Sequence, residues 1–226
     1  MFDIIGMGTS SRPVFNLNDP QQIDEFFLSI FESWRNTLGL TNFYLAAHSF
    51  GGYLMGTYAS LNPQHVKKLI LLSPLGIKNR PPNFDVKRMH YPSGYGPPQW
   101  AKGISEKMWG KINPQSIARK VATEKTVRKF ISKYLDKHMP VPPDEHRALQ
   151  DLVFQMFKRP GSTETALTKL FDCGLHAHNP LQSPARLCNP DLPFPISIVY
   201  GDRDWMDSRG SREIVRTSKF FASGES

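Results

Sequence analysis

A short apolar segment that leads into a turn of small residues constrains the fold of this chain more than any other feature. Residues 42–49, NFYLAAHS, form an apolar run, and residues 49–63, SFGGYLMGTYASLNP, read as a helix that ends at Asn62-Pro63. A second apolar run, rich in Leu and Ile, follows at 65–74. A strand, a helix and a strand within about thirty residues are typical of a βαβ unit in a parallel sheet. The pattern predicts an α/β fold.

Ser49 lies at the turn between this predicted strand and helix. Residues 47–51, AHSFG, fit the nucleophile elbow G-x-S-x-G, with alanine in place of the first glycine. Strand and helix approach each other closely at such a turn, so its flanking residues must be small, as Ala47 and Gly51 are. We interpret Ala47, His48 and Gly51 as the elbow, Ser49 as a nucleophile and the backbone N–H of Phe50 as one oxyanion donor. The alternative is that Ser49 only caps the helix.

A serine nucleophile needs a histidine base and a carboxylate that orients the histidine. In the α/β-hydrolase arrangement the acid follows a later strand. The segment 194–205, FPISIVYGDRDW, predicts such a strand and turn. Spacing from Gly201 favours Asp204 as the acid, with Asp202 as a turn former and Asp207 as the alternative acid. An acidic run of this kind is otherwise a solvated turn.

The histidine base has no clear candidate in the sequence. None of the seven histidines follows Asp204, and the side chain of His48 is expected to point away from that of Ser49. His146 and Asp151 share a spacing known from acyltransferases, which we interpret as chance because nothing around it supports that chemistry. The second oxyanion donor normally comes from an earlier strand, and no such strand is predicted before the first residues.

Two further segments have clear secondary-structure signals. Residues 18–40 predict a helix capped by Asn18 or Asp19 and ended by Gly39. Its apolar residues follow the helical period and predict one buried face: Ile23, Phe26, Phe27, Ile30, Phe31, Trp34 and Leu38. The first ten residues, MFDIIGMGTS, resemble the end of a strand followed by a loop.

The composition changes after residue 77, and three segments are predicted. Residues 1–77 form a hydrolase core with the elbow, 78–190 a basic helical cap insertion, and 191–226 core again with the acid-bearing turn. The cap holds 19 Lys and Arg against 9 Asp and Glu, whereas the rest of the chain holds 9 against 11. The basic excess therefore belongs to the cap.

Within the cap, residues 113–138 predict a basic amphipathic helix that could lie on an anionic bilayer. Its apolar side is expected to hold Ile117, Val121, Val127, Phe130, Ile131, Tyr134 and Leu135, and its lipid contacts to be Lys120, Arg128, Lys129 and Lys133. The alternative is that this helix packs on its own domain with its lysines in water.

Several classes of protein are disfavoured by what the chain lacks. No apolar stretch approaches 18 residues, and the first residues have no basic start of a signal peptide. The two cysteines, Cys173 and Cys188, have no metal-ligand spacing and predict free thiols in a reducing compartment. No metal and no cofactor are expected. Nucleic-acid binding has only the charge in its favour, so none is expected.

Three segments together resemble the α/β-hydrolase-fold proteins of the lipase-coactivator and lysophospholipase subfamily. They are 2–13 (FDIIGMGTSSRP), 47–77 (AHSFGGYLMGTYASLNPQHVKKLILLSPLGI) and 196–207 (ISIVYGDRDWMD), and residues 157–181 resemble the cap of that family. The resemblance implies a parallel sheet flanked by helices, with Ser49 as nucleophile and Asp204 as acid. It also implies a His-Gly loop before this chain and a Gly-His after it. We therefore expect a fragment that is incomplete at both ends.

The resemblance implies a serine hydrolase, or an acyltransferase, acting on acyl esters of phospholipids or lysophospholipids. The expected place is intracellular: cytoplasmic and peripheral at a membrane or lipid droplet, or associated with mitochondria. The chain alone is expected to be nearly inert for lack of the histidine, unless a complementing chain or larger complex supplies it. The main alternative is a non-catalytic protein, a coactivator or structural subunit that binds lipid or protein partners. Another hydrolase chemistry, such as a proline-specific aminopeptidase, is disfavoured by the cap.

Overall fold

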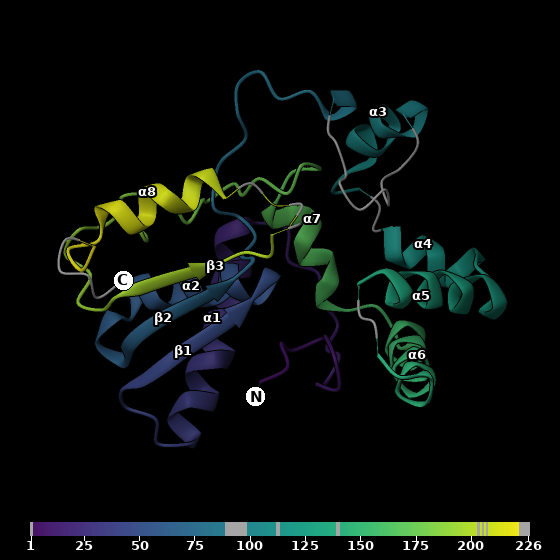
Figure 1. Cartoon of the computed structure of the whole chain (residues 1–226), viewed down its shortest axis with the longest axis horizontal. Helices are drawn as coiled ribbons and strands as arrows, with labels where there is room; N and C mark the ends of the chain where they lie inside the picture. The colour runs from purple at the N-terminus through teal and green to yellow at the C-terminus, as the bar shows by residue number, and fades with distance from the viewer. Residues whose placement is uncertain are drawn as a thin grey trace. The chain divides into compact units, whose positions relative to one another are not determined.

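The computed structural model describes residues 2–88, 99–111, 114–138, 141–202, 204, 206 and 208–221. The chain divides into two compact units (Figure 1). The first contains Met1–Asn16 and Gly110–Thr165, and the second Leu17–Trp109 and Ala166–Ser226. These ranges differ from the three predicted segments, because residues 166–190 group with the second unit and the first sixteen residues with the helical unit. The cap at 78–190 stays a prediction.

The second unit contains a parallel three-stranded sheet. Its strands are β1 (Phe43–His48), β2 (Val66–Leu72) and β3 (Ile196–Val199), in the order β1-β2-β3. The last residues of the strands are in register, because His48 pairs with Leu72 and Leu72 with Val199. Each of these strands is confirmed where the apolar runs predict it. In a parallel sheet all carboxyl ends share one edge, so the segments after the three strands meet there.

Helices α1 (Pro20–Thr37) and α2 (Ser49–Leu61) lie on one side of this sheet (Figure 1). Asp19 caps α1 by accepting a hydrogen bond from the backbone of Gln22 at 2.9 Å, and Gly39 ends it in the left-handed region with φ of 65°. Both features confirm the predicted helix. The buried face holds Ile23, Phe27 and Phe31, whereas Leu38 is 55% exposed because it lies beyond the last turn.

The core of the second unit forms between α2 and residues 166–194. Tyr53 and Phe171 are fully buried, with ring centroids 4.9 Å apart. Gly76 sits beside both rings with φ of 69°, and a side chain there would come within 2.7 Å of each ring. The remaining elements of this unit are η1 (Pro63–His65), η2 (Val86–Arg88), α3 (Gln99–Met108), α7 (Leu167–Leu170) and α8 (Arg209–Thr217).

The first unit is helical. Its helices are α4 (Pro114–Val121), α5 (Glu124–His138) and α6 (Pro143–Lys158), and η3 (Thr163–Ala166) lies where the two units join in sequence. Val127, Ile131 and Leu135 of α5 pack with Phe154 of α6 in a small core. The prediction of one helix over 113–138 is wrong, because α4 ends at Val121 and the Thr123 hydroxyl accepts from the Thr126 backbone at the start of α5.

The first residues also differ from the prediction. Residues 2–10 form turns and irregular structure, with the backbone N–H of Gly6 donating to the carbonyl of Ser11 at 2.7 Å. The segment is held by residues of the same unit, since the Thr163 hydroxyl donates to the carbonyl of Ile5. No strand end is found among these described residues. No helix in the described ranges is long and apolar enough to cross a bilayer.

Candidate active site

Ser49 lies in a sharp turn between a strand and a helix, with an uncommon backbone conformation. β1 ends at His48, and Ser49 adopts φ of 54° before α2 continues from it. A non-glycine residue in this region is uncommon and costs about 1–3 kcal/mol unless its surroundings hold it there. The Ser49 carbonyl accepts a hydrogen bond from the Leu75 backbone at 3.1 Å, which ties the turn to the segment after β2.

Close packing explains the small residues around this turn. A side chain at Gly52 would lie 2.9 Å from Cβ and 3.1 Å from Cα of Pro74. These neighbouring atoms belong to a rigid ring and backbone, so nothing larger than glycine fits without movement. Ala47, which lies in β1 two residues before Ser49, is half-buried. The predicted elbow did not include Gly52, although the Gly51-Gly52 pair was its visible signal in the sequence.

Asp204 lies on the turn after β3, at the same edge of the sheet as Ser49. Its backbone N–H donates to the carbonyl of Gly201 at 3.1 Å, and its Oδ1 accepts from the backbone of Met206 at 3.0 Å. Its Oδ2 accepts a hydrogen bond from the Ser73 hydroxyl. The carboxylate is therefore held by its own turn and by the segment after β2. Asp202 is exposed, and Asp207 lies outside the described residues.

The predicted oxyanion donor lies in the first turn of α2. Backbone N–H groups in the first turn of a helix have no partner within the helix, so that of Phe50 is available in principle to a developing oxyanion. The Phe50 side chain is buried and packs edge-on against Phe27 and Phe171, with ring centroids 5.6 and 6.1 Å apart. This packing fixes the backbone next to Ser49.

None of the following histidines is paired with the serine or the acid, although His48 directly precedes Ser49 in the chain. His48 is exposed at the end of β1, the ring of His65 is 3.0 Å from the carbonyl of Thr41, and His178 is exposed. His176 Nδ1 is 3.1 Å from the carboxylate of Asp172. Within the described ranges no hydrogen bond joins a histidine to Ser49 or Asp204.

The spacing of His146 and Asp151 does not bring these two residues together. His146 Nε2 is 3.1 Å from the carboxylate of Asp136, whereas Asp151 pairs with Arg128 at 2.5 Å. Each residue has its own partner in the helical unit. His90 lies outside the described residues.

The predicted lipid-contact residues have different environments. Lys120, Lys129 and Lys133 are exposed. Arg128 instead binds Glu124 and Asp151, and its guanidinium lies 4.2 Å from the ring centroid of Phe154. Arg128 is therefore engaged within its own unit.

The residues of the expected apolar side differ in burial. Val127, Ile131 and Leu135 are buried, whereas Phe130 and Tyr134 are 59% and 46% exposed and Val121 is 74% exposed. At 100° per residue, Phe130 and Tyr134 lie on the side of α5 that also holds Lys133 and Lys137. The outer face of α5 is therefore both aromatic and basic.

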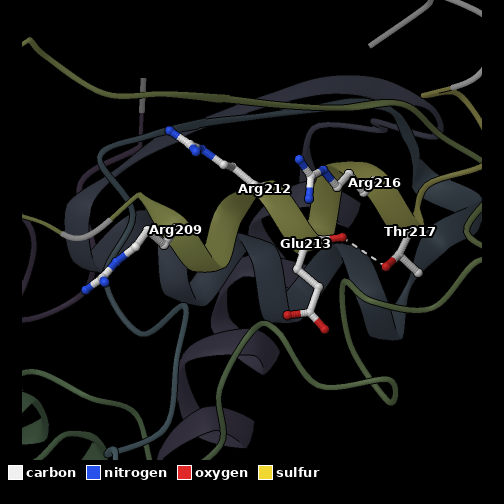
Figure 2. A pocket seen from close by; sticks show the side chains of 5 residues that line it. All are labelled: Arg209, Arg212, Glu213, Arg216 and Thr217. Carbon is white, nitrogen blue, oxygen red and sulfur yellow. Dashed lines mark hydrogen bonds between the residues drawn. The ribbon is translucent and has the colours of Figure 1, made fainter.

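A separate hollow of about 490 Å³ is lined by α8 (Figure 2). Its lining residues are Arg209, Arg212, Glu213, Arg216 and Thr217. Figure 2 shows Arg212 and Arg216 on one side of the helix and Glu213 on the other, so the charged groups do not converge on one point. Neither Ser49 nor Asp204 lines it.

The sequence model of the alpha/beta hydrolase fold family matches residues 1–219, and the chain belongs to this family. Its sheet and flanking helices agree with that fold. Solved structures at 14–20% identity share it: a bacterial membrane phospholipase A superposes with a TM-score of 0.56 over 96% of this chain and 58% of its own. A thermophilic esterase from Thermogutta terrifontis gives 0.54 over 96% and 68%.

Curated relatives confirm the resemblance to lipid-acting members of the family. The chain is 29% identical to the human (lyso)-N-acylphosphatidylethanolamine lipase, over 94% of this chain and 59% of the relative. It is 28% identical to a 1-acylglycerol-3-phosphate O-acyltransferase of Arabidopsis thaliana, over 96% and 51%. The chain spans between half and three-fifths of the length of these relatives.

Proposed function

We propose that this protein is a serine hydrolase or acyltransferase that acts on acyl esters of phospholipids or lysophospholipids. The main support is the left-handed backbone of Ser49 at the carboxyl edge of the sheet, with the Asp204 carboxylate held at the same edge. The names of the lipase and acyltransferase relatives support the substrate class.

In the proposed reaction, Ser49 Oγ attacks the ester carbonyl while a histidine base takes the serine proton. The oxyanion is stabilised by the Phe50 N–H. The ester C–O bond then breaks, the proton passes to the leaving alcohol, and an acyl-enzyme remains. Water releases the acid in a hydrolase, and a second alcohol takes the acyl group in a transferase. None of the described histidines is bonded to Ser49 or Asp204, so the reaction needs another histidine as the base, on this polypeptide or on a complementing chain.

The test is turnover of lysophospholipid by the protein as isolated from its source, compared with its Ser49→Ala variant. Loss of a serine nucleophile lowers kcat by about 10³-fold or more. Ser60→Ala is the matched control. Ser60 lies in the same helix, eleven residues after Ser49, and its hydroxyl donates to the carbonyl of Thr57. Equal turnover by Ser49→Ala and its parent contradicts the proposal.

A second candidate function is non-catalytic lipid binding, favoured by the outer face of α5. Exposed aromatic side chains with lysines beside them suit the surface of an anionic membrane or lipid droplet. This binding would not need Ser49. A Ser49→Ala protein that keeps its lipid binding and its cellular effect would favour the second candidate over the first.

A further inference from the structure

The segment between β2 and the core, residues 73–75, contacts both turns of the candidate site. The Ser73 hydroxyl donates to Asp204, and the Ser73 N–H donates to the carbonyl of Val199 at 2.8 Å. At its other end, the Leu75 N–H donates to the carbonyl of Ser49 at 3.1 Å. We call residues 73–75 the connector. It joins the acid turn to the nucleophile turn through three hydrogen bonds.

The connector begins with an unusual backbone conformation. Ser73 has φ of 43°, in the left-handed region that glycine adopts at no steric cost. A serine in this region is strained, and such a conformation persists only where the surroundings compensate. What serine supplies and glycine lacks is the hydroxyl, and this hydroxyl contacts Asp204.

We propose that Ser73 is a positioning residue for the acid of this site, an inference that rests on the proposed function. Its hydroxyl holds the Asp204 carboxylate in one orientation, and the connector sets that carboxylate relative to Ser49. Together these contacts fix the positions of the acid and the nucleophile, and so the position that the base must occupy between them.

The hydrogen bonds of Asp204 leave room for that base. A carboxylate has about four acceptor positions. One is used by the Met206 N–H and one by the Ser73 hydroxyl. The remaining positions can accept an imidazole N–H, so Ser73 fixes the carboxylate without displacing the base.

The decisive variant is Ser73→Gly, measured on the protein as isolated from its source. Glycine suits the backbone of residue 73, so the melting temperature should equal or exceed that of the parent. With the hydroxyl gone, the acid can rotate and the base loses its alignment, so kcat should fall by about 10- to 100-fold. KM should stay within about twofold, because the hydroxyl faces the acid and not the substrate.

Ser73→Ala completes the comparison. It also lacks the hydroxyl but keeps the strained backbone, so it should match Ser73→Gly in kcat and melt at a lower temperature. Both variants lack the hydroxyl, but only Ser73→Gly also relieves the backbone strain. The comparison therefore separates the effect of the hydroxyl from the effect of the backbone conformation.

Four results would overturn the proposal. The first is parental kcat in Ser73→Gly while Ser49→Ala is inactive, which leaves the proposed function standing. The second is a loss of activity in Ser73→Gly that follows a fall in its melting temperature, which would mean a structural role. The third is a change in KM alone. Full turnover by both Ser49→Ala and Ser73→Gly would reject the proposed function as well.

Discussion

Substitution of Gly52 by alanine tests the close approach of α2 to the connector. The new methyl group would lie 2.9 Å from Cβ and 3.1 Å from Cα of Pro74. Carbon atoms do not approach this closely, and the proline ring and backbone cannot rotate away. Helix α2 would have to move, and Ser49 begins that helix.

The net effect is the difference between two opposing contributions. Overpacking costs about 1–3 kcal/mol. Alanine in a helix is favoured over glycine by about 1 kcal/mol, which offsets part of this cost. We therefore expect Gly52→Ala to lower the free energy of unfolding by up to about 2 kcal/mol, or the melting temperature by up to about 8 °C.

Gly103→Ala is the matched control, because Gly103 lies within α3 of the same unit. Among the described residues, a side chain there meets only Cε of Lys87, at an ordinary 3.5 Å. This variant should gain up to about 1 kcal/mol from helix propensity alone. Thermal and urea unfolding of both variants should therefore shift in opposite directions. A Gly52→Ala protein at least as stable as its parent would refute the packing argument.

Two further predictions concern pH and lipid binding. A hydrogen bond from Arg35 lowers the pKa of Glu32 to about 2, so the ionised form stabilises the fold above pH 4.5 and this contribution is lost as pH falls from 4.5 towards 2. Solvent screening weakens the effect of this partly exposed group, so in urea unfolding Glu32→Gln should lower the free energy of unfolding by about 1–2 kcal/mol at pH 7 and by little near pH 2. An equal loss of stability at both pH values would contradict this role of ionised Glu32. Phe130→Ser with Tyr134→Ser should weaken flotation with vesicles of anionic phospholipid by at least about tenfold, while Arg128→Gln, whose guanidinium is already engaged, should change it less. A larger loss of flotation in Arg128→Gln than in the double variant would contradict lipid binding by the outer face of α5.

The sheet, and the strand, turn and helix around Ser49, could be predicted because their signals are local. β1, α2 and β2 follow one another in the chain, and Gly51-Gly52, Asn62-Pro63 and the apolar runs mark their limits. The relation of Ser49 to the turn of Asp204 follows from parallel strands whose carboxyl ends share an edge. These inferences need only periodicity and turn chemistry.

The parts that sequence analysis missed depend on tertiary contacts. Serine has no strong preference for the left-handed region, so nothing in the segment LLSPLG marks Ser73 as a residue that contacts Asp204, 131 positions later. The break between α4 and α5 had a weak local signal, since Thr123 caps α5 and Glu124 follows it in the first turn. The exposure of Phe130 and Tyr134 depends on which side of α5 meets Phe154, and periodicity alone did not decide it.

Whether Ser49 carries the acyl group during turnover is tested most directly by peptide mass spectrometry of the acyl-enzyme. The protein from its source is mixed with lysophospholipid, quenched in acid and digested, and the acylated peptide is sequenced. We expect one acyl group on the peptide that contains Ser49, and none in the Ser49→Ala variant. Turnover with the acyl group on another residue, or with unchanged labelling of Ser49→Ala, would contradict the account.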